Sequence, residues 1–235
     1  MMTAMDFHDR HVVVTGGAGA LGTAVVSALI SAGATCRVPC FNEAEAARFP
    51  LRNHKQVSLA VTGNLAEEAG VKRAYEGIVA LWASIHIAGG FAMGAIQDTD
   101  KAGLMAMLNT NLVSCYLCCR AAIRAFGPSG GRIVNVTARP GLEPRLGAGM
   151  AAYAASKAAV AAFTQALAAE VAGRGILVNA IAPSIIDTPA NRAAMPKADH
   201  AAWPKPEEIA ATIAFLASPA NLVTTGAVAP VPGRT

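Results

Sequence analysis

The sequence is poor in charged and in aromatic residues. Of its 235 residues, 14% are charged and 5% are aromatic, and the formal net charge is +4. It has no run of lysine or arginine, so it lacks the basic patch expected of a nucleic-acid-binding protein. No uninterrupted apolar run approaches the ~20 residues that span a bilayer, and residues 1–10 lack the apolar core of a signal peptide. We therefore expect a cytoplasmic protein with no nucleic-acid and no membrane partner.

The sequence also lacks the paired cysteines of a disulfide scaffold. It has five cysteines, an odd number, and they lie inside the strands and helices predicted below, which favours a reducing compartment. Cys115 and Cys118 match the pattern C-x-x-C, but they lie in mid-helix beside Cys119 with no second ligand pair. We interpret these thiols as buried packing residues and expect no metal site.

No serine- or proline-rich linker divides the chain, and 54% of its residues are hydrophobic, enough for a sheet buried on both faces. Strands are predicted at 12–14, 35–38, 57–61, 83–87, 132–136, 177–181 and near Val228, and helices at 19–32, 43–48, 67–79, 101–126, 150–172 and 206–217. This alternation predicts a single α/β domain over residues 1–235, a doubly wound parallel sheet with helices on both faces.

A glycine-rich turn follows the first predicted strand. Gly17, Gly19 and Gly22 form the pattern G-x-G-x-x-G between a strand and a helix. There the glycines permit a tight turn and let the backbone approach a pyrophosphate at the helix N-terminus. A glycine turn without a ligand is the less favoured alternative.

A tyrosine and a lysine lie one turn apart in the alanine-rich helix 150–172. Tyr153 and Lys157 therefore project from the same helix face. A free tyrosine has a pKa near ~10, and a nearby positive charge lowers that pKa, which would make the phenol a proton donor at near-neutral pH. On its own, this spacing more often means a rim aromatic beside a solvated lysine.

A third motif runs from Pro183 to Thr188, after a buried strand. Together the motifs resemble the short-chain dehydrogenase/reductase family along essentially the whole chain. The matching segments are 15–22, 86–89, Asn111, Tyr153 with Lys157, and 183–188. The resemblance implies a Rossmann fold and an NAD(P)(H)-dependent oxidoreductase, which moves hydride between the nicotinamide and a small carbonyl, hydroxyl or quinonoid, pterin-like compound.

The resemblance also implies a role for each matching residue. Tyr153 would donate or accept the proton, Lys157 would lower its pKa and hold the nicotinamide ribose, and Asn111 would hold a water in a proton relay. A backbone-capping role for Asn111 is the alternative. The other implied cofactor contacts are Gly16, Ala18, Leu21, Cys40, Asn64, Leu65, Ala88, Gly89, Pro183, Ile186 and Thr188.

Some positions depart from the family pattern. Ala20 replaces the middle glycine of the loop, His86 and Ile87 replace two asparagines, and Ser184 replaces a glycine. Cys40 stands where an acid would bind the adenosine ribose of NAD, and no arginine follows it to bind the phosphate of NADP. Glu43 is either that acid or a first-turn helix charge, so the choice between NAD and NADP stays open.

The most serious departure follows strand 132–136. Thr137 and Ala138 stand where the family usually has two serines, so the catalytic hydroxyl is missing. Such a donor contributes ~2.7–4 kcal/mol of transition-state stabilisation in subtilisin. Either the substrate is an activated one that does not need this donor, or Thr137 or another group compensates for it. A third alternative is that the protein is a weak or inactive catalyst that binds dinucleotide as a regulator or scaffold. The sequence is similar to dihydropteridine reductases in the form of its glycine loop and in its lack of this serine.

The substrate side carries less information. Thr137, Ala138 and Arg139 are candidate substrate contacts, although Arg139 and Arg145 fit exposed loop arginines equally well. A substrate loop at about 187–205 is short, which predicts a small or open pocket. The family resemblance implies a homo-oligomer, a tetramer or a dimer, in which helices 101–126 and 150–172 meet across the interface.

Overall fold

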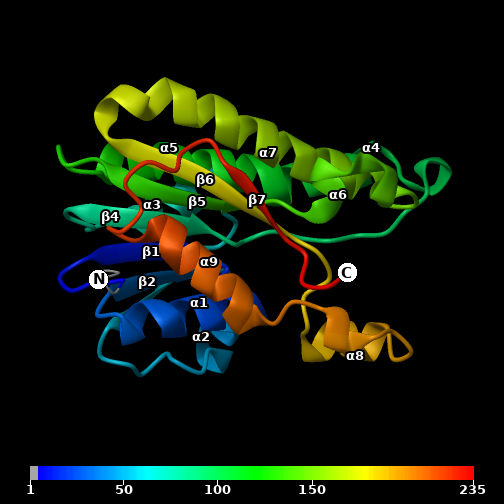
Figure 1. The fold of residues 1–235 in the computed structure, drawn as a ribbon, viewed down its shortest axis with the longest axis horizontal. Helices are drawn as coiled ribbons and strands as arrows, with labels where there is room; N and C mark the ends of the chain where they lie inside the picture. The colour runs from blue at the N-terminus through cyan, green and yellow to red at the C-terminus, as the bar shows by residue number, and fades with distance from the viewer. Residues whose placement is uncertain (1–4) are drawn as a thin grey trace.

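The computed structural model describes residues 5–235 and consists of one parallel sheet between two layers of helices (Figure 1). Its strands are β1 His11–Thr15, β2 Thr35–Cys40, β3 Val57–Val61, β4 Leu81–His86, β5 Gly131–Val136, β6 Ile176–Pro183 and β7 Val228–Val231. They lie in the order β3-β2-β1-β4-β5-β6-β7, and each pairs in parallel with its neighbours. The predicted doubly wound α/β fold, a Rossmann fold, is confirmed.

Helices cover both faces of the sheet. The α-helices are α1 Ala20–Ser31, α2 Glu43–Arg48, α3 Glu68–Tyr75, α4 Lys101–Met107, α5 Ser114–Ala125, α6 Arg139–Leu142, α7 Ala151–Val171, α8 Pro189–Ala194 and α9 Pro206–Ala217. Figure 1 shows α1, α2 and α9 below the sheet, and α5 and α7 above it.

The central strands are apolar without interruption because both of their sides are buried. Val13 packs among residues of α5 and α7, whereas Val12 and Val14 pack on the opposite face against α1 and α9. Successive side chains of a strand point to opposite faces, so a strand covered on both faces needs an unbroken apolar run. Burying each such side chain contributes roughly 1.5–3 kcal/mol.

The structure corrects the predicted helix 101–126. It consists of α4, a π-helical turn at Leu108–Val113, and α5. The wider π turn carries Asn111, which is 2% exposed, and such turns often occur at functional sites. An apolar pattern does not reveal a single π turn, because the helix resumes after it.

Other boundaries also differ from the prediction. The predicted helix 67–79 ends at Tyr75, and Gly77 then takes a φ of +71°. The loop after β5 contains α6 and a short 3-10 helix at Pro144–Gly147. The predicted substrate loop contains α8 and a 3-10 turn at His200–Ala202.

One segment of the described residues is long and apolar enough to cross a membrane by length and composition. It is Lys101–Ala125, which forms α4, the π turn and α5, and one third of its most apolar window, 33%, is buried in the fold. Core helices of globular proteins pass the same test, so this segment is weak support for a membrane location.

Candidate functional site

The candidate site lies where the strand order reverses. The chain proceeds from β1 outward to β3 on one side and from β4 to β7 on the other. The helices that follow these two strands therefore cover opposite faces of the sheet, and in such sheets ligands bind in the crevice at this point of reversal. Thr15 and His86, the last residues of these strands, are direct neighbours across the sheet.

A cavity of about 450 Å³ occupies this crevice. The loops after β1, β2, β3 and β4 line it, together with the π turn. The lining residues are Gly16, Gly19, Ala20, Leu21, Gly22, Pro39, Phe41, Glu45, Thr62, Gly63, Asn64, Leu65, Ile87, Ala88, Gly89, Thr110 and Ser114. The structure thus brings together six predicted cofactor positions: Gly16, Leu21, Asn64, Leu65, Ala88 and Gly89.

Two glycines of the loop are required by close backbone contacts. Gly16 has a φ of +66°, and a Cβ there would lie 2.7 Å from the Ala88 nitrogen. A Cβ on Gly22 would lie 2.1 Å from the Gly16 oxygen. Helix α1 begins after Gly19, which provides no side-chain cap. The first N–H groups of α1 therefore remain available to an anion at the cavity.

The end of β2 differs from the prediction for Cys40. Its side chain is fully buried in the core and does not reach the cavity, because β2 extends to this residue and turns it inward. The neighbouring Phe41 and Glu45 line the cavity instead. The Glu45 carboxylate accepts a hydrogen bond of 2.5 Å from the Phe41 N–H. Glu43, the acid proposed from the sequence, is exposed and is not part of the lining.

Four other predicted cofactor positions do not line the cavity. Ala18 and Ile186 are partly buried and pack against the core, and Pro183 is buried at the end of β6. The Thr188 hydroxyl accepts a hydrogen bond from the Asn191 N–H and caps α8.

The inner end of the cavity lies beside Asn111 and Lys157. A Cβ on Gly89 would lie 2.7 Å from the Asn111 Oδ1 and 3.2 Å from the Lys157 Nζ. The absence of a side chain at Gly89 therefore allows both polar groups to lie close to its backbone. Asn111 Oδ1 accepts from the Gly90 N–H at 2.9 Å, and its Nδ2 donates to the Gly90 oxygen and to the Ser156 Oγ. The amide therefore clamps the loop after β4 onto α7. Its water relay stays a prediction.

Lys157 is a buried cation. Only 5% of it is exposed, and its Nζ donates to the Val136 carbonyl at 3.0 Å. Burial lowers the pKa of Lys157 to about 8, because removing an ammonium from water disfavours its charged form. Lys157 therefore keeps its charge at neutral pH, although its pKa lies only about one unit higher.

Tyr153 lies one turn before Lys157 on α7. Its ring packs edge-on against Phe91, with centroids 4.9 Å apart and an interplanar angle of 83°. Burial raises the pKa of Tyr153 to about 12. Desolvation is the cause of this shift, and the expected lowering of the pKa by Lys157 is not found in this structure. The phenol is fully protonated at neutral pH.

The loop after β5 provides no replacement for the missing serine hydroxyl. Ala138 is 5% exposed, and the Thr137 Oγ1 donates to the Lys157 carbonyl at 2.5 Å. Thr137 therefore anchors α7 and does not compensate as a donor. Arg139 donates to Glu143 and to the Thr235 main-chain oxygen. These contacts occupy its guanidinium, which is therefore not free to bind a substrate anion.

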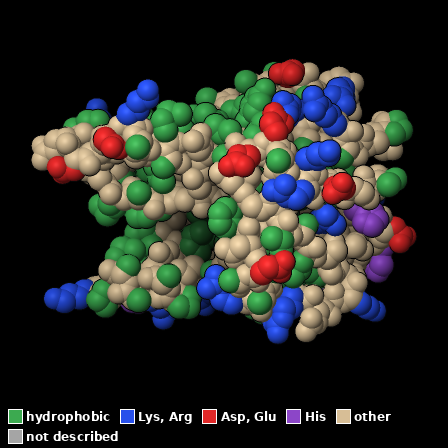
Figure 2. All heavy atoms as spheres, turned by 180° about the vertical axis from the view of Figure 1, so that it is seen from behind, with side chains coloured by type: hydrophobic (Ala, Val, Ile, Leu, Met, Phe, Trp, Pro, Cys, Tyr) green, Lys and Arg blue, Asp and Glu red, His purple; other side chains and the backbone are tan. Residues whose placement is uncertain are grey.

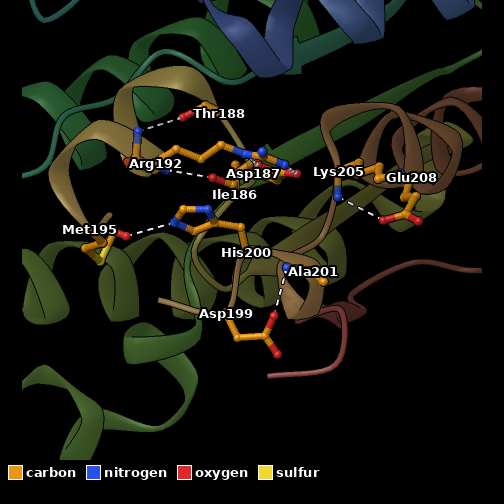
Figure 3. Close-up of polar contacts among 11 residues, drawn as sticks. Ile186, Asp187, Thr188, Arg192, Met195, Asp199, His200, Ala201, Lys205 and Glu208 are labelled. Carbon is orange, nitrogen blue, oxygen red and sulfur yellow. Dashed lines mark hydrogen bonds and ion pairs between the residues drawn. The ribbon is translucent and has the colours of Figure 1, made fainter. Parts of the chain in front are cut away.

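Polar contacts hold the segment 187–205 together. Arg192 donates to both carboxylate oxygens of Asp187, at 2.5 and 2.7 Å, and lowers the pKa of Asp187. His200 Nε2 lies 2.8 Å from the Met195 oxygen, which fastens the end of the loop onto α8 (Figure 3). Figure 2 shows the molecule hollowed at the end that carries α8, with hydrophobic side chains inside the hollow.

Comparison with known proteins agrees with this geometry. The family model described as short chain dehydrogenase matches residues 10–199. The chain belongs to the short-chain dehydrogenase family. The predicted enzyme class, a short-chain oxidoreductase, is thereby confirmed, whereas the likeness to dihydropteridine reductases stays a prediction.

Several individual relatives cover nearly the whole chain. A 3-oxoacyl-acyl-carrier-protein reductase, FabG of Vibrio harveyi, is 30% identical over 94% of this chain and 95% of its own length. Galactitol 2-dehydrogenase of Rhizobium johnstonii is 34% identical over 92% and 91%. The solved structure of ElxO with NADP bound shares the fold, with a TM-score of 0.87 and 24% identity over 95% and 97%. The predicted cofactor class, NAD(P)(H), agrees with the family.

The buried ammonium leads to a prediction about stability. The pKa of Lys157 falls from 10.5 to about 8 on folding, so burying the charge costs the folded state stability below pH 8, on the order of 3 kcal/mol. This cost disappears between about pH 8 and pH 10.5. We expect Lys157→Met to raise the free energy of unfolding at pH 7 by about 1–3 kcal/mol, and the gain to shrink as the pH approaches 10.

Urea unfolding of both proteins at pH 7 and pH 10, without dinucleotide, measures the effect. Lys55→Met is the control, because Lys55 is exposed and its replacement should change stability by less than about 0.5 kcal/mol. A Lys157→Met variant that is less stable than the parent at pH 7 would contradict the prediction.

Proposed function

We propose that the protein is an NAD(P)(H)-dependent oxidoreductase of a small carbonyl, hydroxyl or quinonoid compound. One observation carries the proposal: the cavity at the strand-order reversal ends at Gly89, directly beside Lys157 and Asn111. Gly16, Gly22 and the free N-terminus of α1 support a pyrophosphate at its other end. A nicotinamide bound there supplies or accepts the hydride.

The side chains on α7 handle the proton. Tyr153 keeps its proton at neutral pH because of its raised pKa, so in the direction of reduction it donates that proton to the substrate oxygen or nitrogen. Lys157 provides a positive charge one turn away, which stabilises the phenolate that remains. Phe91 packs against the Tyr153 ring and supports an apolar, flat substrate at this position.

Tyr153→Phe tests the proposed proton donor. We expect a loss of turnover of at least about 100-fold, the lower range for a lost general acid, with the dinucleotide Kd nearly unchanged because the lost hydroxyl acts on the substrate. NADH and NADPH are screened against quinonoid dihydropteridine, quinones, diketones and simple ketones, and binding is measured by titration calorimetry. Tyr116→Phe, at an exposed tyrosine of α5, is the control. Residual turnover near that of the parent would reject Tyr153 as the donor.

We further propose a preference for NAD(H) that comes from Glu45. Its carboxylate lines the cavity at the end of β2, where an acid binds the adenosine ribose and repels the phosphate of NADP. We expect Glu45→Gln to reduce the ratio of kcat/KM for NADH over NADPH roughly tenfold, the effect of about 1.4 kcal/mol. Glu43→Gln is the matched control, since Glu43 lies on the same helix outside the lining. Equal ratios in both variants would remove Glu45 from cofactor selection.

A second candidate function is a dinucleotide-binding regulator or scaffold with little turnover. Ala138 in place of serine favours it, because the Thr137 hydroxyl is committed to the Lys157 carbonyl. The substrate screen separates the two functions. Dinucleotide binding without turnover of any compound class would favour the regulator.

We also propose that the protein is a cytoplasmic homo-oligomer, a tetramer or a dimer. Helices α5 and α7 lie side by side on one face, and their Tyr116 and Phe163 rings are 5.4 Å apart. Tyr116 is 48% exposed, which supports a further apolar contact at this face. We expect light scattering at micromolar concentration to give the mass of a dimer or a tetramer, and Tyr116→Glu to lower it. A monomeric mass for the parent protein would contradict this.

A further inference from the structure

Three potential metal ligands meet in the core just behind the candidate site. They are His86 at the end of β4, and Cys115 and Cys119 on successive turns of α5. Their ligand atoms all lie within 4.8 Å of one another. The residues are 3%, 4% and 1% exposed. The register of α5 turns both thiols toward the same side.

The sulfur distances within this cluster suit a small cation, and the 2.8 Å hydrogen bond between His86 Nδ1 and Asn135 Oδ1 is the contact that a cation would replace. Cys119 Sγ lies 3.4 Å from His86 Nδ1 and 3.5 Å from Asn135 Oδ1. With Zn–S bonds of about 2.3 Å and Zn–N bonds of about 2.0 Å, neighbouring ligands of a tetrahedral zinc are roughly 3.5 Å apart. His86 and Asn135 are also direct neighbours on β4 and β5, so the sheet itself fixes two of the donors.

A surrounding set of hydrogen bonds orients these donors. His86 Nε2 lies 2.8 Å from Ser84 Oγ, which lies 2.6 Å from Tyr75 OH. Asn135 Nδ2 donates to Thr164 Oγ1 at 2.9 Å, so the Asn135 oxygen faces the cluster. Metal-bound histidines typically donate their second ring N–H to such an oxygen. Two thiols and an imidazole, oriented by a second layer of polar partners, form a donor set that Zn²⁺ prefers.

We propose that His86, Cys115 and Cys119 bind one thiophilic divalent cation of the Zn²⁺ class, with the Asn135 amide oxygen as the fourth ligand. Binding releases two protons, one from each thiol, as the two sulfur-metal bonds form. The imidazole stays neutral: its Nδ1 binds the cation and its Nε2–H donates to Ser84. Two thiolates balance the charge of the cation.

The position of the site gives the cation a structural role. It would tie the end of β4 to α5, and these two elements lead to Ala88 and Asn111 on the cavity side. Lys157 lies within electrostatic reach of Cys115. Because all three ligands are buried, the cation must enter while the chain folds or while α5 separates from the sheet.

The test is therefore refolding of the full chain from urea with and without ZnCl₂, followed by dialysis and metal analysis. We expect about one zinc per chain in the parent protein and a Tm above that of protein refolded without zinc. Cys115→Ser, Cys119→Ser and the double variant should each lose the zinc and the rise in Tm. Refolding with Co²⁺ should give a thiolate charge-transfer absorbance in the parent only.

Cys118→Ser is the matched control. Cys118 is as buried as its neighbours and lies on the same helix, but it packs with Val71 and Leu117. We expect this variant to keep the zinc and the absorbance. Circular dichroism checks that each variant folds, and His86→Asn provides a second loss variant if a serine variant does not. The proposal is overturned if the parent retains no more zinc than the double variant, or if Cys118→Ser loses as much as Cys119→Ser.

Discussion

The close approach of the β1 and β4 loops is the constraint on which the site depends. At Gly16 the backbone comes so near to Ala88 that a Cβ would lie 2.7 Å from its nitrogen. The Thr15 hydroxyl accepts from the Ala88 N–H at 3.3 Å and fixes the two loops against each other. Because the strand order reverses here, this contact between the two loops also forms part of the cavity wall, which Gly16 and Ala88 line.

A second constraint is the placement of a charge in the core. Lys157 reaches the Val136 carbonyl at the end of β5, while the Thr137 hydroxyl holds the Lys157 carbonyl. Through these two bonds, the ammonium and the main-chain carbonyl of Lys157 both attach α7 to the end of β5. The folded state accepts a depressed pKa at Lys157 to keep an ammonium next to the cavity, a loss of stability that is common at functional sites.

The fold could be predicted because the strands of a doubly covered sheet must be apolar throughout and the glycine turn has few structural meanings. Residues whose backbone lines the cavity, such as Gly16 and Ala88, could be placed from the motifs alone. Cys40 could not, because whether the last residue of β2 points inward depends on where that strand ends. Glu45, on α2, and Phe91, in the loop after β4, were not expected at the site for a related reason: their positions depend on how these segments pack against others, and no local pattern marks them.

Two departures from the family pattern, at Ala138 and at His86, differ in what they change. At Ala138 a hydroxyl is absent from the substrate side, and the remaining threonine hydroxyl binds backbone. At His86 an asparagine position is taken by an imidazole, whose Nδ1 lies 2.8 Å from Asn135 Oδ1 and whose ring is buried beneath the loop that carries Ala88. A hydroxyl is thus lost at Ala138, whereas at His86 one polar side chain replaces another. The support of the lysine comes from the core, where its ammonium binds the Val136 carbonyl, and in the proposed mechanism Tyr153 alone provides the proton.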